Sequence, residues 1–217
     1  MGQTPSMNDE VRFVHVDDGL LVVEKPAGML CVPGRGALAF DALSLRVQRR
    51  YPEALIVHRL DMATSGLLLM ARGKAAQRRL GAAFAQRVVE KRYVAIVAGL
   101  MAPESGVVDL PLAADWERRP MQAVDPVRGK PSLTHYRVLA CDANAQTTRV
   151  ELRPATGRSH QLRVHMHALG HPIVGDALYG PPHLRDVATR LMLHASSLRF
   201  THPVSGRCVE FESAAPF

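Results

Sequence analysis

Residues 58–72, HRLDMATSGLLLMAR, join a polar segment to a run of apolar residues. The apolar run at 67–71 has the length of a buried strand, and the Thr-Ser-Gly sequence before it favours a turn. A loop that enters a buried strand holds reactive side chains rigidly while solvent can still reach them. The stretch therefore predicts a sheet with a functional loop at the start of one strand. It also raises the question of why Arg59 and Asp61 stand on that loop.

The other apolar runs predict a protein with more strand than helix. Residues 11–16 and 20–24 are separated by Asp-Asp-Gly, which is typical of a hairpin turn. Further runs with the composition of strands lie at 88–97, 133–139, 148–152, 191–200 and 208–211.

Three segments have the pattern of helices. One spans 41–51 with Asp41 at its N-terminus, and a second spans 74–86 with a basic outer face. The third spans 159–169, with Ser159 as the expected N-cap and a glycine just past the end. Helices inserted between strands at irregular intervals indicate an α+β fold around a mixed, largely antiparallel central sheet, rather than a doubly wound fold.

The charge balance suggests a polyanionic partner. The 217 residues carry 27 Lys and Arg against 20 Asp and Glu, a net charge of +7, and only four of the basic residues are lysines. The arginine guanidinium binds phosphate with a planar fork of donors and stacks on bases, so this composition favours nucleic acid. A genome rich in G and C, which favours arginine codons, explains the same bias equally well.

The cysteines and the N-terminus favour a protein that works in a reducing compartment. Cys31, Cys141 and Cys208 stand far apart and include no C-x-x-C pair, so they predict neither a disulfide framework nor a zinc ribbon. We therefore expect a reduced cytoplasm. Residues 1–9 are polar, and we expect a disordered tail there rather than a signal peptide. The chain has no apolar run long enough for a membrane span, so we expect no membrane association.

Asp61 has two interpretations when only its own segment is considered. A carboxylate on an exposed loop is a candidate nucleophile or base. Its commoner role is to bond the backbone of its own turn. The H-R-D signature of protein kinases does not fit, because Leu60 separates the arginine from the aspartate and the chain has no D-F-G.

A second polar segment, PATGRSHQLRVHMHALGHP, spans residues 154–172. On the expected helix, Leu162, Met166 and Leu169 form an apolar stripe, which turns Arg163 toward another surface and lets it face a cleft. The four histidines suggest a metal site, yet no H-E-x-x-H occurs and no carboxylate lies within the segment. We therefore expect polar or RNA-facing histidines and no metal.

Six longer segments carry a family resemblance. They are HRLDMATSGLLLMAR (58–72), KRYVAIVAG (91–99), DLPLAADWERRPMQAV (109–124), GKPSLTHYRVL (129–139), TGRSHQLRVHMHALGHPIVGDALYG (156–180) and LMLHASSLRFTHP (191–203). In this order they resemble the motifs of the RluA-type pseudouridine synthases. The resemblance covers nearly the whole chain from about residue 11, and it implies an α+β pseudouridine synthase catalytic domain with flanking helices and a central RNA-binding cleft.

The resemblance extends to domain organisation and substrate. Many relatives carry a small S4 RNA-binding domain before the catalytic domain, whereas here we expect residues 10–217 to form a single catalytic domain. Together with DWERRPMQ at 115–122, this resembles the compact founding subfamily, whose members act on a 23S rRNA stem-loop and on the anticodon loop of certain tRNAs. The implied partner is RNA, either 23S rRNA, tRNA or both, bound by a monomer.

The resemblance implies roles for residues that match the family motifs. Asp61, in H-R-L-D, is the catalytic carboxylate, and Arg163, the second arginine of T-G-R-x-H-Q-x-R, pairs with it. Tyr93, in K-x-Y, stacks on the target uracil and is the candidate for taking the C5 proton. Arg59 fills the gap left in the RNA when the uridine flips out. The other expected contacts to RNA or substrate come from His58, Leu60, Thr64, Arg158 and His160.

These implied roles fit the chemistry of pseudouridine formation. The reaction breaks the N-glycosidic bond, rotates the uracil and rejoins it through C5, so it is redox-neutral and needs no cofactor. A carboxylate suits the electron-poor ribose C1′, and an arginine partner favours its charged form in a partly buried site. Asp61 either attacks C1′ or removes the C2′ proton to give a glycal. The alternatives are an enzyme of this family that uses one RNA class, a non-catalytic RNA-binding protein and, more distantly, a metal-dependent hydrolase.

Overall fold

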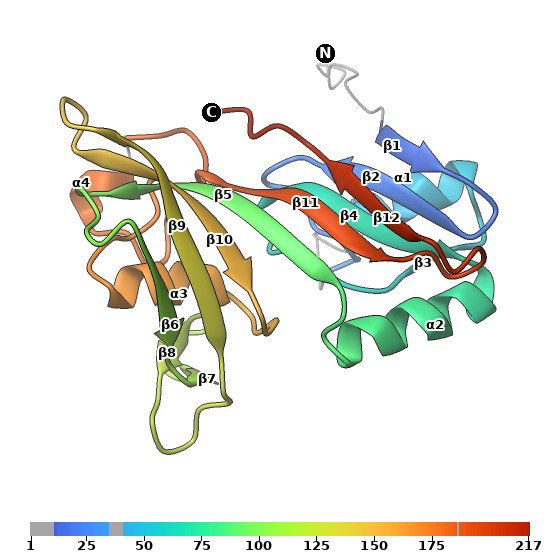
Figure 1. Cartoon of the computed structure of the whole chain (residues 1–217), viewed down its shortest axis with the longest axis horizontal. Helices are drawn as coiled ribbons and strands as arrows, with labels where there is room; N and C mark the ends of the chain where they lie inside the picture. Colours follow the sequence, from blue (N-terminus) through green and yellow to red (C-terminus); the bar gives the residue numbers. More distant parts are fainter. Residues whose placement is uncertain (1–10, 35–40, 186) are drawn as a thin grey trace, which may run out of the picture.

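A computed structural model describes residues 11–34, 41–185 and 187–217 of the chain (Figure 1). The expected tail at 1–9 lies outside these residues. The strands are β1 (Arg12–Val16), β2 (Leu20–Lys25), β3 (Ala54–Ile56), β4 (Ser65–Arg72), β5 (Glu90–Ala98), β6 (Ser105–Asp109), β7 (Leu112–Ala114), β8 (Gln122–Val124), β9 (Leu133–Asp142), β10 (Thr147–Pro154), β11 (Leu193–Thr201) and β12 (Cys208–Glu212). The helices are α1 (Leu43–Arg50), α2 (Gly73–Ala85), α3 (Gln161–Ala168) and α4 (Pro182–Arg185).

One large sheet organises the described residues. Its main path has the order β1-β2-β4-β11-β5-β10-β9-β6, with β3 added to β4 and β12 added to β11, while β7 and β8 form a separate hairpin. Only β4 and β11 pair in parallel within the described ranges; the other strand pairs are antiparallel. The predicted α+β class and the mixed, largely antiparallel sheet are therefore confirmed.

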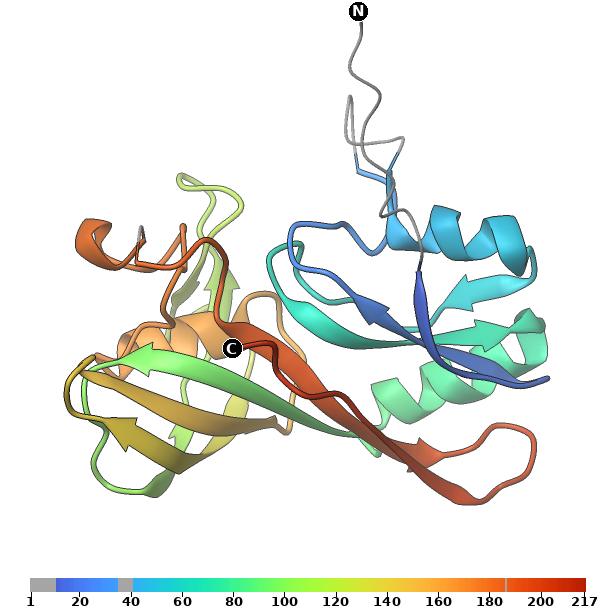
Figure 2. The same ribbon diagram turned by 90° about the horizontal axis from the view of Figure 1, so that it is seen from above.

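Strand β4 is buried on both faces, as its apolar run predicts. Side chains alternate between the two faces of a strand. Leu67 and Leu69 pack in one core with α2, and Leu68 and Met70 pack in another with α1. Figure 2 shows the two helices on opposite sides of these strands. The loop before β4 is thus attached to one of the most buried strands of the sheet.

A further core lies between α3 and the strands β5, β10 and β11. Leu162 and Met166 of α3 pack there with Val97 and Leu152 of the sheet. Tyr93 of β5 packs against both this core and the core under α1. The long strands β5 and β11 run from the part of the sheet that packs on α3 to the part that packs on α1 and α2 (Figures 1 and 2). Tyr93 therefore lies where the core under α3 meets the core under α1.

The parallel pairing of β4 with β11 depends on Gly66. This residue has a φ of +112°, a conformation that glycine adopts without strain. It pairs with Ala195, and a Cβ at this position would lie 2.3 Å from the Ala195 carbonyl oxygen. A glycine at 66 thus lets β4 approach β11 directly after the polar loop.

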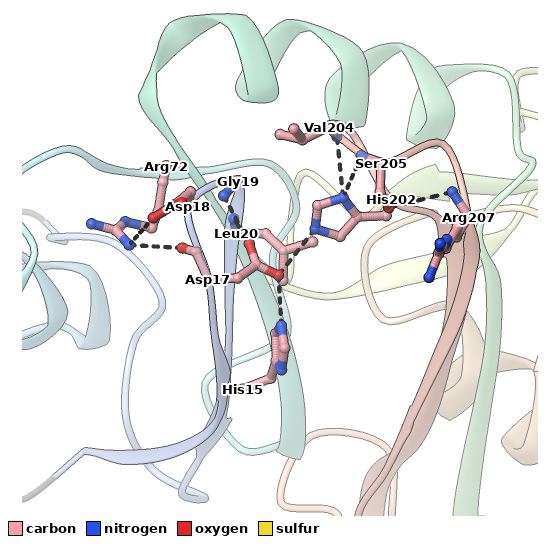
Figure 3. A network of polar contacts seen from close by, with 10 residues as sticks. All are labelled: His15, Asp17, Asp18, Gly19, Leu20, Arg72, His202, Val204, Ser205 and Arg207. Carbon is pink, nitrogen blue, oxygen red and sulfur yellow. Dashed lines mark hydrogen bonds and ion pairs between the residues drawn. The ribbon is translucent and has the colours of Figure 1, made fainter.

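Asp17 fixes the turn between β1 and β2 (Figure 3). Its Oδ1 accepts hydrogen bonds from two backbone N–H groups of the turn, and its Oδ2 lies 2.6 Å from Nε2 of His15 and 3.0 Å from Nε2 of His202. His202 Nδ1 accepts two backbone N–H groups, so its proton is on Nε2 and is donated to Asp17. Burial opposes ionisation, but these hydrogen bonds lower the pKa of Asp17 to about 2. The predicted hairpin is thereby tied to the β11–β12 turn.

The predicted starts of two helices are wrong. Helix α1 is capped by Ala42, and the Asp41 carboxylate instead accepts hydrogen bonds from Arg46. Helix α3 is capped by His160 rather than Ser159, with a φ of +54° and no hydrogen bond from its side chain to the helix backbone. The apolar stripe of α3 is also shorter than predicted, because Leu169 is 38% exposed. None of the helices in the described ranges is long and apolar enough to cross a membrane.

Candidate active site

A cleft of about 1030 Å³ gathers the residues singled out in the sequence. Its walls come from the loop at 58–64, strand β5, the segment that leads into α3 and the β7–β8 hairpin. Segments that are far apart in the chain thus meet at one site. The nine candidate residues all line this cleft: His58, Arg59, Leu60, Asp61, Thr64, Tyr93, Arg158, His160 and Arg163.

Buried contacts hold the loop that carries Asp61. The Lys25 ammonium is fully buried and donates to three backbone carbonyl oxygens, including that of Met62 at 2.9 Å. The Cys31 sulfur lies 3.2 Å from the backbone nitrogen of Leu60, from which it accepts a hydrogen bond, and 3.3 Å from the Leu60 carbonyl oxygen, to which it donates. The backbone is therefore fixed on both sides of Asp61.

Burial changes the ionisation of the two anchoring groups. It lowers the pKa of Lys25 to about 8, although the neighbouring Cys31 and Asp61 oppose this shift. Burial also raises the pKa of the Cys31 thiol. At neutral pH the lysine is still mostly charged and the thiol is protonated, so both groups keep the protons that they donate to the loop.

Arg163 lies in the first turn of α3 and faces two carboxylates. Its side chain is 4% exposed, and its Nε and Nη2 donate to the Asp176 carboxylate at 2.7 and 2.6 Å. Its Nη1 lies 3.6 Å from Oδ2 of Asp61. The predicted pair with Asp61 is present, but the bidentate partner is Asp176. Burial alone would raise the pKa of Asp176, yet the hydrogen bonds from Arg163 hold it below its usual range.

Tyr179 connects this ion pair to the β7–β8 hairpin. Its ring lies over the Arg163 guanidinium, 5.1 Å from ring centroid to Cζ. Its hydroxyl accepts the backbone N–H of Gln122 at 2.8 Å and lies 2.7 Å from Nδ1 of His160, to which it can donate. Burial raises the pKa of Tyr179 to about 12 and lowers the pKa of His160, although the charge of Asp61 opposes the latter shift. Both groups are therefore neutral at neutral pH.

The sheet fixes the position of Tyr93. It lies on β5 between Leu152 of β10 and Ala195 of β11. Burial raises the pKa of its phenol, and the negative charge of Asp61 raises it further. Tyr93 therefore presents a neutral phenol to the cleft at neutral pH.

Arg59 and His58 differ in what they offer to a ligand. Arg59 is exposed, and within the described residues it forms no ion pair with Asp61. The His58 ring stacks on Phe84, with 4.5 Å between centroids, and its Nε2 accepts the backbone N–H of Leu69. Burial lowers the pKa of His58 to about 3. Arg59 is free to reach a ligand, whereas His58 is a neutral part of the cleft wall.

Two of the remaining candidates mainly support the loop, and the other two can contact a ligand. Leu60 and Thr64 are only 8% and 2% exposed, so their side chains mainly support the loop. Arg158 and His160 are half-buried on the segment that leads into α3. Both line the cleft, so their polar groups can reach a ligand there.

Two other histidines near α3, His165 and His171, bond to the fold. His165 is fully buried between the hydroxyl of Thr134 and the carbonyl oxygen of Leu110, and Nδ1 of His171 lies 2.8 Å from the carbonyl oxygen of Ala98. In the part of the chain that the structure describes, no group of three or more His, Cys, Asp or Glu side chains could hold a metal ion. These histidines thus have structural partners.

Residues 19–168 match the family model described as RNA pseudouridylate synthase. The chain belongs to the RNA pseudouridylate synthase family. It is therefore an isomerase that converts uridine in RNA to pseudouridine. The cleft built around Asp61 lies largely within the matched residues.

The named relatives of this synthase align with almost the whole of its chain. The dual-specificity RNA pseudouridine synthase RluA of Escherichia coli strain K12 is 51% identical over 213 residues, which are 98% of this chain and 97% of that protein. The protein of the same name from Pasteurella multocida is 47% identical over 99% of this chain and 97% of its own. The solved structure of human RNA pseudouridylate synthase domain containing 1 superposes with a TM-score of 0.82, at 34% identity, over 99% of this chain and 87% of the human chain.

Three groups that organise the site of this synthase were not predicted from the sequence. Asp176 and Tyr179 lie within the segment at 156–180 that carries the resemblance, but neither has a spacing that points to Arg163. Lys25 follows a buried strand directly and precedes Pro-Ala-Gly, a turn sequence. A lysine that ends a buried strand is the signal that could have suggested a buried ammonium bonded to carbonyl groups.

Proposed function

We propose that Asp61 initiates the isomerisation by acting on the ribose of a uridine held in the cleft. The carboxylate either attacks C1′ or removes the C2′ proton, and both routes break the bond between C1′ and N1 of the uracil. The detached uracil turns, C5 bonds to C1′, and the C5 proton is lost while N1 gains one. No electrons enter or leave, so no cofactor or metal is required by the balance of the reaction.

The ion pair between Asp61 and Arg163 carries this proposal. Nη1 of Arg163 lies 3.6 Å from Oδ2 of Asp61, so the guanidinium attracts and orients the carboxylate that acts on the ribose in either route. Asp176 occupies the other side of Arg163 with two short hydrogen bonds. Arg163 is therefore oriented by Asp176 and keeps one N–H edge for Asp61, whose side chain is 27% exposed and lines the cleft.

Tyr93 supplies the surface on which the uracil stacks. Its ring is fixed by the sheet beside Asp61, and its raised pKa supports a neutral phenol that donates or accepts a hydrogen bond. A neutral phenol is a weak base. Removal of the C5 proton by Tyr93 would therefore need another group to take the phenol's own proton in the same step.

Arg59 is proposed to occupy the space that the flipped uridine leaves in the RNA. Its exposure and its lack of an ion pair with Asp61 support this role. A base must leave its stack before an enzyme can act on its glycosidic bond, and a guanidinium can both stack on the neighbouring bases and contact phosphate. Arg158 and His160 line the same cleft and are proposed to bind the RNA, while His58, Leu60 and Thr64 shape the loop that carries Arg59.

The substrates are proposed to be a stem-loop of 23S rRNA and the anticodon loop of tRNA. The name of the RluA relatives, dual-specificity RNA pseudouridine synthase, supports two RNA classes. We further propose that residues 10–217 act as one catalytic domain and as a monomer. Three free cysteines, two of them exposed, support a reducing compartment such as the cytoplasm.

Release of tritium from C5 of uridine tests the proposal. Transcripts of each RNA class, labelled with tritium at uridine C5, are incubated with the protein in the presence of a metal chelator and no added cofactor. We expect release from both RNAs. Release from only one class would remove the dual specificity, release that the chelator abolishes would contradict the metal-free chemistry, and no release from either RNA would contradict the proposed function.

A further inference from the structure

The exposed indole of Trp116 is the most unusual surface group of the cleft. It is the only tryptophan of the chain, and its side chain is 67% exposed although large aromatic side chains are usually covered. It lies on the turn between β7 and β8 and lines the cleft together with Arg119. The Arg119 guanidinium lies over the indole ring, 3.8 Å from its centroid. The exposed fraction shows that much of the ring surface is still open to solvent.

The hairpin that carries Trp116 is braced at both ends. Within the turn, the Asp115 carboxylate accepts the backbone N–H of Arg118 and pairs with its side chain at 2.7 Å. At the base, Leu112 is buried in a small cluster with Tyr179, whose hydroxyl accepts the backbone N–H of Gln122. The exposed ring is therefore presented by a structured support.

The chemistry of the pair fits a nucleobase better than another protein surface. Arg119 has no acidic partner within the described residues, so its positive charge is not neutralised by the fold. Further basic side chains, Arg59, Arg87 and Lys91, line the same cleft. An open aromatic face beside unneutralised cations is the arrangement that binds unpaired bases and their phosphates. An apolar protein partner would gain nothing from the charges.

We propose that Trp116 and Arg119 form a stacking platform for one unpaired base of the RNA loop, separate from the uridine that enters the Asp61 site. This inference rests on the proposed function, because it assigns the platform to the same RNA substrate. The indole stacks on the base while Arg119 contacts the adjoining phosphate. The platform then contributes affinity and selects loops that have a base at the right distance from the target.

The single tryptophan allows the stacking to be measured directly. The Asp61→Asn variant is titrated with an unlabelled anticodon stem-loop RNA while tryptophan fluorescence is recorded, so that binding is followed without turnover. We expect strong quenching when the base stacks on the indole. Replacing the loop nucleotides one at a time by abasic residues should remove the quenching at one position only, and that position should not be the target uridine.

Variants of the turn separate stacking from charge. Trp116→Ala should weaken RNA binding about 5- to 150-fold, the range for loss of one base–aromatic stack, while Trp116→Phe should lose less. Arg119→Ala should weaken binding and lower the salt slope by about one. Its matched control is Arg128→Ala, since Arg128 pairs with Asp125 at 2.8 Å, lies outside the β7–β8 turn and does not line the cleft, and we expect its affinity and salt slope to be unchanged.

The outcomes also separate this inference from the proposed function. If the wild-type protein releases C5 tritium but RNA causes no quenching, or if Trp116→Ala binds as tightly as the parent, the platform is refuted and the function stands. If quenching occurs but no RNA yields tritium, the proposed function fails while the indole still binds RNA. Equal losses for Arg128→Ala and Arg119→Ala would refute the assignment of Arg119.

Discussion

Asp176→Asn tests whether Asp176 is the main support of Arg163. The substitution keeps the shape of the side chain but removes the charge that faces a guanidinium with 4% exposure. Loss of the Asp176 charge leaves Arg163 with the longer 3.6 Å contact to Asp61, and breaking one partner of a buried pair costs about 3–5 kcal/mol. Both hydrogen bonds to Arg163 are shorter than 2.8 Å and Asp176 is 1% exposed, so we expect the free energy of unfolding to fall by an amount in this range.

Urea unfolding at neutral pH measures this loss, with Glu90→Gln as the matched control. Glu90 pairs with Arg199 at 3.6 Å, but the two side chains are 70% and 48% exposed, so the control should lose about 0–1 kcal/mol. A loss for Asp176→Asn no larger than that of the control would refute the reasoning.

The pH dependence of the same pair gives a second check. The pKa of Asp176 is lowered in the folded protein, so its stabilising effect is present above the usual carboxyl value of 3.8 and is lost as the pH falls below it. The difference in stability between the parent and Asp176→Asn should therefore narrow below about pH 3.8. A difference that stays constant to lower pH would show that charge is not its source.

Three further variants test other parts of the account. The pKa of His58 is lowered to about 3, so the folded protein loses stability as the pH falls from about 6.5 toward 3. In urea titrations, His58→Gln should reduce the slope of the unfolding free energy against pH by at most about 1.36 kcal/mol per pH unit. An unchanged slope would contradict burial of a neutral His58. Gly66→Ala should destabilise the fold by about 3 kcal/mol or more, because the new Cβ would meet the Ala195 backbone. The control Gly81→Ala, in open space on α2, should stabilise the fold by about 0.5–1 kcal/mol. A tolerated Gly66→Ala would refute the close approach of β4 and β11. Tyr93→Phe keeps the stacking face, so RNA affinity should be retained while the rate of tritium release falls; an undiminished rate would show that the hydroxyl takes no part.

The fold could be predicted where local pattern and burial agree. The run at 67–71 is apolar at every position, and β4 is buried on both faces for the same reason. The β1–β2 hairpin follows from its Asp-Asp-Gly turn. The short strands β3, β7 and β8 could not be predicted, because three residues carry no periodicity and pair only after distant segments have met.

The candidate site could be predicted as a set of residues but not as a network. The resemblance pointed to Asp61, Tyr93 and Arg163, and the structure brings all three to one cleft. The bidentate contact between Arg163 and Asp176 depends on how the chain returns after α3, which no spacing encodes. The helix caps were mispredicted because Asp41 and Ser159 have the residue types of caps, while other contacts decide where each helix begins.

The central claim is that the Asp61 carboxylate opens the glycosidic bond, and single-turnover release of C5 tritium tests it most directly. Wild-type protein and Asp61→Asn are compared at saturating labelled RNA, with binding of each measured in parallel. We expect Asp61→Asn to bind the RNA about as well as the wild type and to release tritium at least about 10⁴-fold more slowly. Release by Asp61→Asn at a rate close to that of the wild type, with binding intact, would contradict the account.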